Sequence, residues 1–158
     1  MEEILSKENI TTEKEFSEIR EHLMKRELLS FVEMMNIYLK RANCMRSDER
    51  IYGNIVEYLL RVSGVKAIWR HRLDRANSKE VQSECVFELS LDGNASEALH
   101  TMVSKNDQKL LFPAGHFNEI FVLGLNINST RHIIDDFEAV VLDKSTGKMS
   151  YISRREKD

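Results

Sequence analysis

Histidine and cysteine are the side chains of this sequence best suited to catalysis or metal binding, and their spacing argues against both. The five histidines are scattered, no two lie four positions apart, and no cysteine or carboxylate completes a metal-ligand pattern with them. Cys85 and His116 form a conceivable nucleophile–base pair, but Cys85 lies in an apolar stripe, where a thiol stays protonated. We therefore expect neither a metal site nor a catalytic residue.

Charged motifs near the C-terminus have ordinary structural explanations. Asp135, Asp136 and Glu138 fit the negative first turn of a helix, which the helix dipole favours. The segment 144–148 (Lys-Ser-Thr-Gly-Lys) lacks the glycine spacing of a phosphate-binding loop. Because no acid, base and nucleophile converge, we expect that this chain is not an enzyme.

Aromatic and histidine side chains supply the candidates for a ligand site. Trp69, Phe87 and Phe112 could line a small-molecule cavity, although filling the core is the simpler interpretation. His71 is expected on the inward face of a strand, where a hydrogen-bonded core histidine is more common than a ligand contact. His116 lies in a loop, which is where binding residues often occur. These five residues are the predicted ligand-binding set.

The composition predicts a domain of ordinary size with no nucleic-acid partner. The chain has 158 residues, of which 42% are hydrophobic and 31% charged. This is enough for one core and a well-solvated surface. A net charge of -3 and a pI of about 6.0 argue against nucleic-acid binding. Arg70, Arg72 and Arg75 could contact an anion or the acidic face of a partner, but a solvated sheet face is the default.

Several features together predict a cytoplasmic protein. Two cysteines are too few for a disulfide framework, and the acidic N-terminus lacks the order of a secretion signal. No apolar run approaches the roughly 20 residues that cross a bilayer. We therefore expect no membrane partner.

Residues 12–43 carry the pattern of a helical arm. Thr12 and Glu15 fit a capping box, and two apolar stripes follow. The arm is either one helix of about 30 residues, roughly 45 Å long, or two helices with a bend near residues 25–26. The first stripe needs cover, so we expect a homodimer. Its residues are Phe16, Ile19 and Leu23.

Two strands and two helices are expected next. Ser47 or Asp48 caps a helix that ends at Ser63–Gly64. Residues 65–73 and 81–91 alternate as strands, which we expect to pair antiparallel with one face in water. Asn94 begins a short helix, and a short strand at 109–112 leads through a hairpin at 113–118 into the next strand.

Residues 119–127 are the most apolar strand of the chain. Both alternating faces are hydrophobic, which predicts a central strand covered on both sides. Gly124 leaves room for the close approach of a helix or a ligand.

The tail has two interpretations. After the capping signal at 128–130, the apolar residues of 133–141 fit a helix that continues through 152. Alternatively, residues 140–143 and 148–152 form a hairpin around the turn 144–147.

The order of elements resembles a known family. The segment from Ile51 to Asp158 resembles a GAF-like sensory domain of bacterial signalling proteins: residues 64–73 look like its first strand, and 111–113 with 121–127 like its late strand pair. The tail 151–158 resembles the stalk that enters a diguanylate cyclase (GGDEF) domain, although none of the cyclase's own nucleotide or metal residues is present. The resemblance implies a regulatory domain that binds a small ligand and controls an output domain, such as a cyclase in c-di-GMP signalling.

We therefore expect an α+β fold with an antiparallel sheet of about four to six short strands and packed helices. The predicted parts are an N-terminal helical arm (1–46), a GAF-like domain (47–142) and a C-terminal stalk (143–158), with a homodimer formed through the terminal helices. The alternative is a protein-interaction adaptor in which the methionine-rich helix 28–45 docks a partner helix and the tail is a hairpin. The sequence names no cofactor, ligand or output domain.

Overall fold

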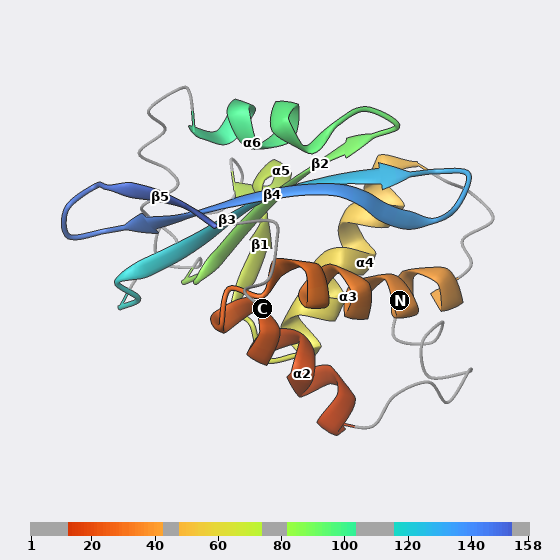
Figure 1. Cartoon of the computed structure of the whole chain (residues 1–158), viewed down its shortest axis with the longest axis horizontal. Coiled ribbons are helices and arrows are strands. Elements are labelled where there is room, and N and C mark those ends of the chain that lie inside the picture. The colour runs from red at the N-terminus through yellow and green to blue at the C-terminus, as the bar shows by residue number, and fades with distance from the viewer. Residues whose placement is uncertain (1–12, 43–47, 74–81, 104–115, 153–158) are drawn as a thin grey trace.

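The computed structural model describes residues 13–42, 48–73, 82–103 and 116–152. These residues form an α+β fold in which helices cover both faces of a five-stranded sheet (Figure 1). The elements in chain order are α2 (Glu13–Met24), α3 (Leu28–Ala42), α4 (Glu49–Val62), β1 (Ala67–Trp69), α5 (Arg70–Leu73), β2 (Cys85–Leu91), α6 (Ala95–Val103), β3 (Glu119–Asn128), β4 (Ile133–Asp143) and β5 (Met149–Ile152).

The sheet is mixed, which corrects the expectation of an antiparallel sheet. Its strand order is β1-β2-β3-β4-β5, with β1, β2 and β3 parallel and the β3–β4 and β4–β5 pairs antiparallel. The predicted antiparallel pair of residues 65–73 and 81–91 is therefore wrong. Residues 70–84 connect β1 to β2, and a parallel connection needs about a dozen residues or more. The alternation predicted a strand within each range, but β1 covers only residues 67–69 of the predicted 65–73, because α5 begins at Arg70, and the alternation carried no information about strand direction.

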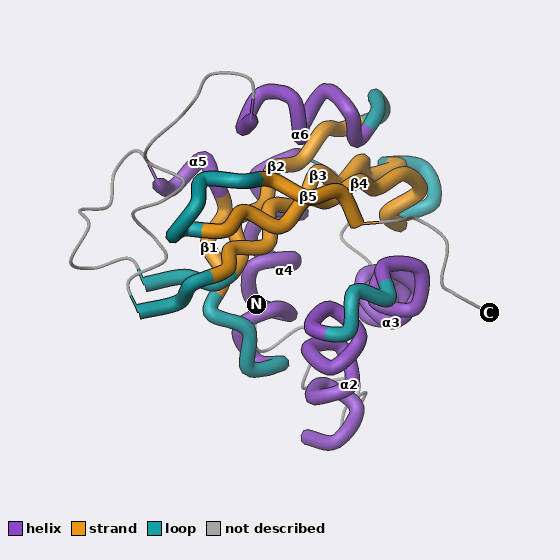
Figure 2. Tube along the Cα trace, turned by 60° about the vertical axis from the view of Figure 1, so that its left-hand side comes forward, coloured by secondary structure: helices purple, strands orange, loops and turns teal. Residues whose placement is uncertain are grey.

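Helices α3 and α4 pack on one face of the sheet, and α2 packs against these two helices, as Figure 2 shows from the side. The arm is two helices: Arg26 between them has a φ of 63°, so the predicted bend near 25–26 is confirmed and the single long helix is wrong. Ile19 and Leu23 are both 0% exposed inside this core. The first stripe is covered by the chain itself, so it gives no reason to expect a dimer.

Helix α6 packs on the opposite face of the sheet (Figures 1 and 2). Gly124 in β3 lies directly beneath it, because a Cβ on this residue would be 2.6 Å from the Ala95 carbonyl oxygen. The predicted close approach at Gly124 is therefore the crossing of a helix. β3 is buried on both faces, which confirms its prediction as the central strand.

Residues 133–143 form strand β4, so the predicted helix at this position is wrong. The capping signal serves a turn instead: the Asn128 side chain accepts hydrogen bonds from the backbone N–H groups of Thr130 and Arg131. A register shift beside Asn126 and Ile127 then interrupts the strand alternation. Asp135, Asp136 and Glu138 lie on this strand and not in the first turn of a helix.

The tail forms the β4–β5 hairpin, so this alternative is confirmed and the helix that continues through 152 is wrong. Asp143 holds the turn, because its carboxylate accepts hydrogen bonds from the Ser145 N–H (2.9 Å) and hydroxyl (2.7 Å). The hydrogen bond from the Ser145 hydroxyl is the main reason that the pKa of Asp143 lies below its usual value. Gly147 supplies the required positive φ of 72°.

Helix α4 begins and ends as predicted. Asp48 accepts a hydrogen bond from the Ile51 N–H at 2.9 Å, and the helix ends at Ser63 and Gly64. The predicted strand 109–112, with Phe112, and the cluster residue Arg75 lie outside the described residues. Within the described ranges, no helix has the length and hydropathy needed to span a membrane.

Candidate functional site

The structure brings together three of the five predicted ligand residues. The rings of Trp69 and Phe87 stack at 6.5 Å, and His71 lies 5.1 Å from Trp69. Trp69 and Phe87 are 4% and 0% exposed, so both rings fill the core. His71 was expected to point inward from a strand, but β1 ends at Trp69, and His71 lies exposed on α5. Ligand binding by these residues stays a prediction.

The other candidates are separated from this group. His116 precedes β3 and so lies at the amino end of the parallel strands, whereas His71 follows β1 at their carboxyl end. The ring of His116 contacts Phe117. Cys85 is fully buried in β2, and burial, followed by the charge of Glu84, raises the pKa of its thiol. Cys85 is therefore a protonated core residue and not a nucleophile.

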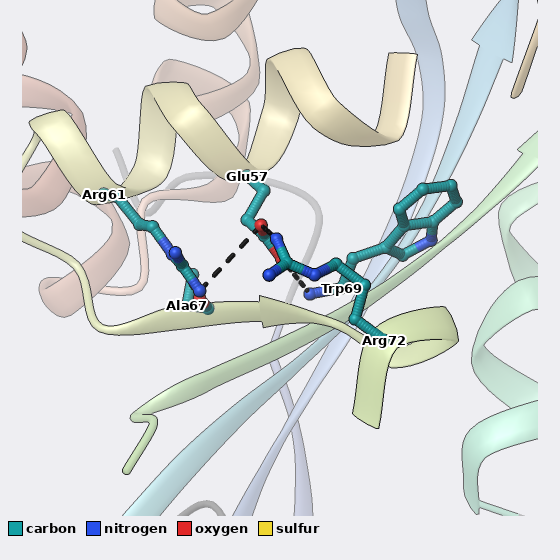
Figure 3. Close-up of polar contacts among 5 residues, drawn as sticks. All are labelled: Glu57, Arg61, Ala67, Trp69 and Arg72. Carbon is teal, nitrogen blue, oxygen red and sulfur yellow. Dashed lines mark hydrogen bonds and ion pairs between the residues drawn. The ribbon is translucent and has the colours of Figure 1, made fainter. Parts of the chain in front are cut away.

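Glu57 is a buried carboxylate that seals the outer edge of β1 (Figure 3). Its Oε2 accepts a hydrogen bond from the Trp69 N–H at 2.9 Å, and its Oε1 pairs with the Arg72 guanidinium. Arg61, one helical turn along α4, donates from Nε to the Ala67 carbonyl at 3.1 Å. Two side chains of α4 thus satisfy backbone groups that a neighbouring strand would otherwise bind.

A second buried carboxylate, Glu84, lies where β1 and β2 begin. Glu84 is 6% exposed; its Oε2 accepts from the Lys66 N–H at 3.0 Å, and its Oε1 lies 3.5 Å from Arg20. A cavity of about 300 Å³ opens beside Lys66. Arg61 and Lys66 line it, together with Gln82 and Ser83. The start of β1 therefore combines a cavity with one arginine, Arg61, that lies beside the buried Glu57 carboxylate.

The edge of β4 beyond the hairpin is sealed in a similar way. The Asn36 side chain on α3 donates to the Ile134 carbonyl (2.9 Å) and accepts from the Ile134 N–H (2.7 Å). An amide side chain thus copies the hydrogen bonds of a neighbouring strand. Such covering is a common protection against unwanted strand pairing.

The outer edge of β5, unlike those of β1 and β4, exposes its backbone hydrogen-bonding groups. The Asp143 N–H donates to the Lys148 carbonyl at 2.9 Å, which makes these residues a hydrogen-bonded pair. Bonded and non-bonded pairs alternate along antiparallel strands, so Met149 and Tyr151 turn their backbone groups away from β4. Within the described residues, no strand pairs with this side. Tyr151 and Met149 are also 78% and 47% exposed.

A groove of about 340 Å³ runs between α6 and the hairpin. Leu99, His100 and Val103 line it from α6, and Glu138 and Tyr151 line it from the strands. Glu97 adds a second carboxylate to the lining. Exposed apolar side chains, an outward-facing backbone and an acidic groove therefore meet at one edge of the sheet.

The carboxyl ends of β2 and β3, where open α/β sheets often bind ligands, are filled by the chain itself. Asn126 is 2% exposed and accepts hydrogen bonds from the Ser90 hydroxyl (2.8 Å) and the Gly93 N–H (2.9 Å). Asp136 accepts from the Ala95 N–H at 2.9 Å and so supplies an internal anion to the first turn of α6. The N-terminus of this helix is already occupied.

Comparisons with protein-family models, with curated proteins and with solved structures find no match to this chain.

Sequence reasoning missed Glu57 and the β5 edge. Glu57 lies between the apolar residues Val56 and Leu60 and four positions before Arg61. A glutamate inside the apolar face of a helix, with an arginine one turn later, was the available signal. No sequence pattern of this kind indicates that Tyr151 is exposed. Its exposure depends on the position of α6, which packs on β2, β3 and β4 and not on β5.

Proposed function

We propose that this protein is a protein-interaction module that holds an extended segment of a partner protein against β5. The observation that supports the proposal best is the outward-facing backbone of Met149 and Tyr151, whose side chains are also exposed. Strand addition uses such an edge: the backbone supplies affinity, and pockets for alternate side chains supply specificity. Tyrosine is also enriched among the residues that dominate binding energy at interfaces.

The contrast with the other edges supports this choice of surface. Glu57 and Arg61 occupy the backbone groups of β1, and Asn36 occupies those of Ile134 on β4. An open edge that displays a tyrosine and a methionine is a liability unless it is used. The edge at β5 is therefore the one where a partner strand meets the least obstruction among the described residues.

The groove beside β5 determines the chemistry of the partner. Glu97 and Glu138 are carboxylates, whereas Leu99 and Val103 are apolar. A segment that alternates a basic and an apolar residue would complement both, with its apolar residue against Tyr151. We expect such a segment to bind as a strand of about four residues, the length of β5.

This proposal follows the adaptor alternative and changes its docking surface. The methionine-rich helix was expected to dock the partner, but Met35 is 0% exposed in the core. Regulation of an attached output domain stays a prediction. Its main motivation was a pair of helical arms, and the structure instead shows α2 in the core and the tail in a hairpin.

The test begins with segments selected from a random-peptide library displayed on phage, without reference to any known partner. We expect the selected peptides to alternate basic and apolar residues. Met149→Pro removes an outward N–H without removing a bond to β4, so it should reduce peptide affinity at least about tenfold. Leu29→Ala, which changes a residue of similar exposure (42%) on α3, should leave affinity unchanged.

Two results would contradict the proposal. One is a set of selected peptides whose affinity falls with Leu29→Ala as much as with Met149→Pro. The other is a dimer, observed by sedimentation, that Met149→Pro dissociates. This second result would mean that β5 pairs with a second copy of the chain and not with a partner segment.

A further inference from the structure

We propose that the cavity beside β1 binds a small ligand that carries a phosphate group. This site lies at the edge of the sheet opposite β5 and is independent of the interaction surface proposed above. Its lining comes from the end of α4, from the residues leading into β1 and from Gln82 and Ser83. None of the four predicted ligand residues that the structure describes, Trp69, His71, Phe87 and His116, lines it.

The charge around the cavity suits a dianion. Two positive side chains, Arg61 and Lys66, and no carboxylate are among its described lining residues, whereas the whole chain carries a net charge of -3. A phosphate monoester carries a charge of about -1.5 to -2 at neutral pH, which matches this excess.

The Arg61 guanidinium is held in place before any ligand arrives. Its Nε is bonded to the Ala67 carbonyl, and one Nη lies 3.9 Å from Glu57 Oε1. About half of this side chain (51%) remains exposed, so N–H groups still face outward. A guanidinium fixed in this way loses little conformational freedom when it binds an anion.

The Lys66 amine and the Ser83 hydroxyl are hydrogen-bond donors that the described residues do not use. Within the described part of the chain, no carboxylate lies within 4.0 Å of the Lys66 amine and no group hydrogen-bonds the Ser83 hydroxyl. Both residues line the cavity, where a phosphate oxygen could accept from each.

The size of the cavity indicates more than a bare ion. A volume of about 300 Å³ is at the lower end of the range for small-molecule sites. Val65 and Ile68 contribute apolar side chains to the lining. The cavity therefore has room for a compact organic group attached to the phosphate.

Backbone amide shifts measured during titration with glycerol phosphate, and separately with malonate, at constant ionic strength test this inference. We expect glycerol phosphate to produce saturable shifts at Gly64–Ile68 and Ser83, and malonate to bind at least about tenfold more weakly. Lys66→Gln should weaken the phosphate ester about tenfold and Ser83→Ala about fivefold. Lys148→Gln, which removes the same charge from the β4–β5 turn, is the matched control and should change nothing.

Three results would overturn the proposal. The first is a set of shifts that never saturates or that spreads over the whole surface. The second is equal affinity for malonate. The third is an equal loss of affinity in Lys148→Gln and Lys66→Gln, which would indicate only general attraction between charges.

Discussion

At the scale of single residues, Glu57 does most to join separate parts of the fold. It connects α4 to the backbone of β1 and to Arg72 on α5. A buried carboxylate is costly unless it is paired and hydrogen-bonded, and Glu57 is both. Its pairing with half-exposed arginines contributes little by itself, because water screens such pairs. The bond to the Trp69 N–H is therefore the larger contribution.

Replacement of Glu57 tests this assignment. Glu57→Ala leaves the Trp69 N–H without its acceptor and should lower the free energy of unfolding by about 1–3 kcal/mol. Glu57→Gln keeps an acceptor oxygen and should cost less. Urea unfolding measures both, with Glu33→Ala, an exposed change on α3, as the control within about 0.5 kcal/mol of the wild type. An equal loss in Glu57→Ala and Glu33→Ala would contradict the role of Glu57.

The Cys85 thiol should make the free energy of unfolding fall at alkaline pH. Burial raises its pKa in the folded protein, so the unfolded chain loses this proton first as the pH rises. The free energy of unfolding should therefore be unaffected by this group below about pH 8.5 and should fall above it. Cys85→Ala should reduce the difference in stability between about pH 7 and pH 10. The same difference in the variant and the wild type would show that the thiol does not contribute.

At the scale of elements, sequence periodicity predicted the elements whose environment is uniform along their length. β3 is covered on both faces throughout, and α4 has one continuous buried side. β4 lacked this uniformity. Its first residues follow a turn closed by Asn128, and the register shift changes which residues face the core. The resulting spacing of apolar residues is close to that of a helix.

The periodicity of the sequence could not predict whether β1 runs parallel or antiparallel to β2. Parallel and antiparallel strands show the same alternation, and only the connection distinguishes them. The short helix α5 begins directly after Trp69, and this moved His71 from its predicted inward position to the surface. Three of the predicted ligand residues still came together, because Trp69 and Phe87 face each other across paired strands.

Gly124 determines how closely α6 approaches the sheet. In Gly124→Ala, the new Cβ would lie 2.6 Å from the Ala95 carbonyl oxygen and 2.8 Å from the Leu99 nitrogen, both backbone atoms. We expect a loss of about 1–3 kcal/mol, because the helix must move away. Gly93→Ala meets no atom closer than 3.8 Å and should be nearly neutral. Thermal unfolding that gives equal midpoints for the two variants would contradict this account of the crossing.

At the scale of the whole molecule, the two edges of the sheet differ in how their backbone groups are covered, and we assign them different binding roles. Side chains from α3 and α4 close the edges of β4 and β1, and the cavity beside β1 retains unused polar groups. At the opposite edge of the sheet, no strand in the described part of the chain pairs with the outer side of β5. The sequence could not predict either surface, because both depend on which strand lies at an edge and which helix covers it.

Amide hydrogen exchange along β5 tests the central claim most directly. In the free protein, the amides of Met149 and Tyr151 should exchange quickly, whereas the Ser150 amide, which faces β4, should be slower. A bound segment selected from the peptide library should slow Met149 and Tyr151 at least about tenfold, because each then donates to the added strand. If these two amides still exchange quickly in a saturated complex, or are already protected in the free monomer, β5 is not the edge that receives a partner.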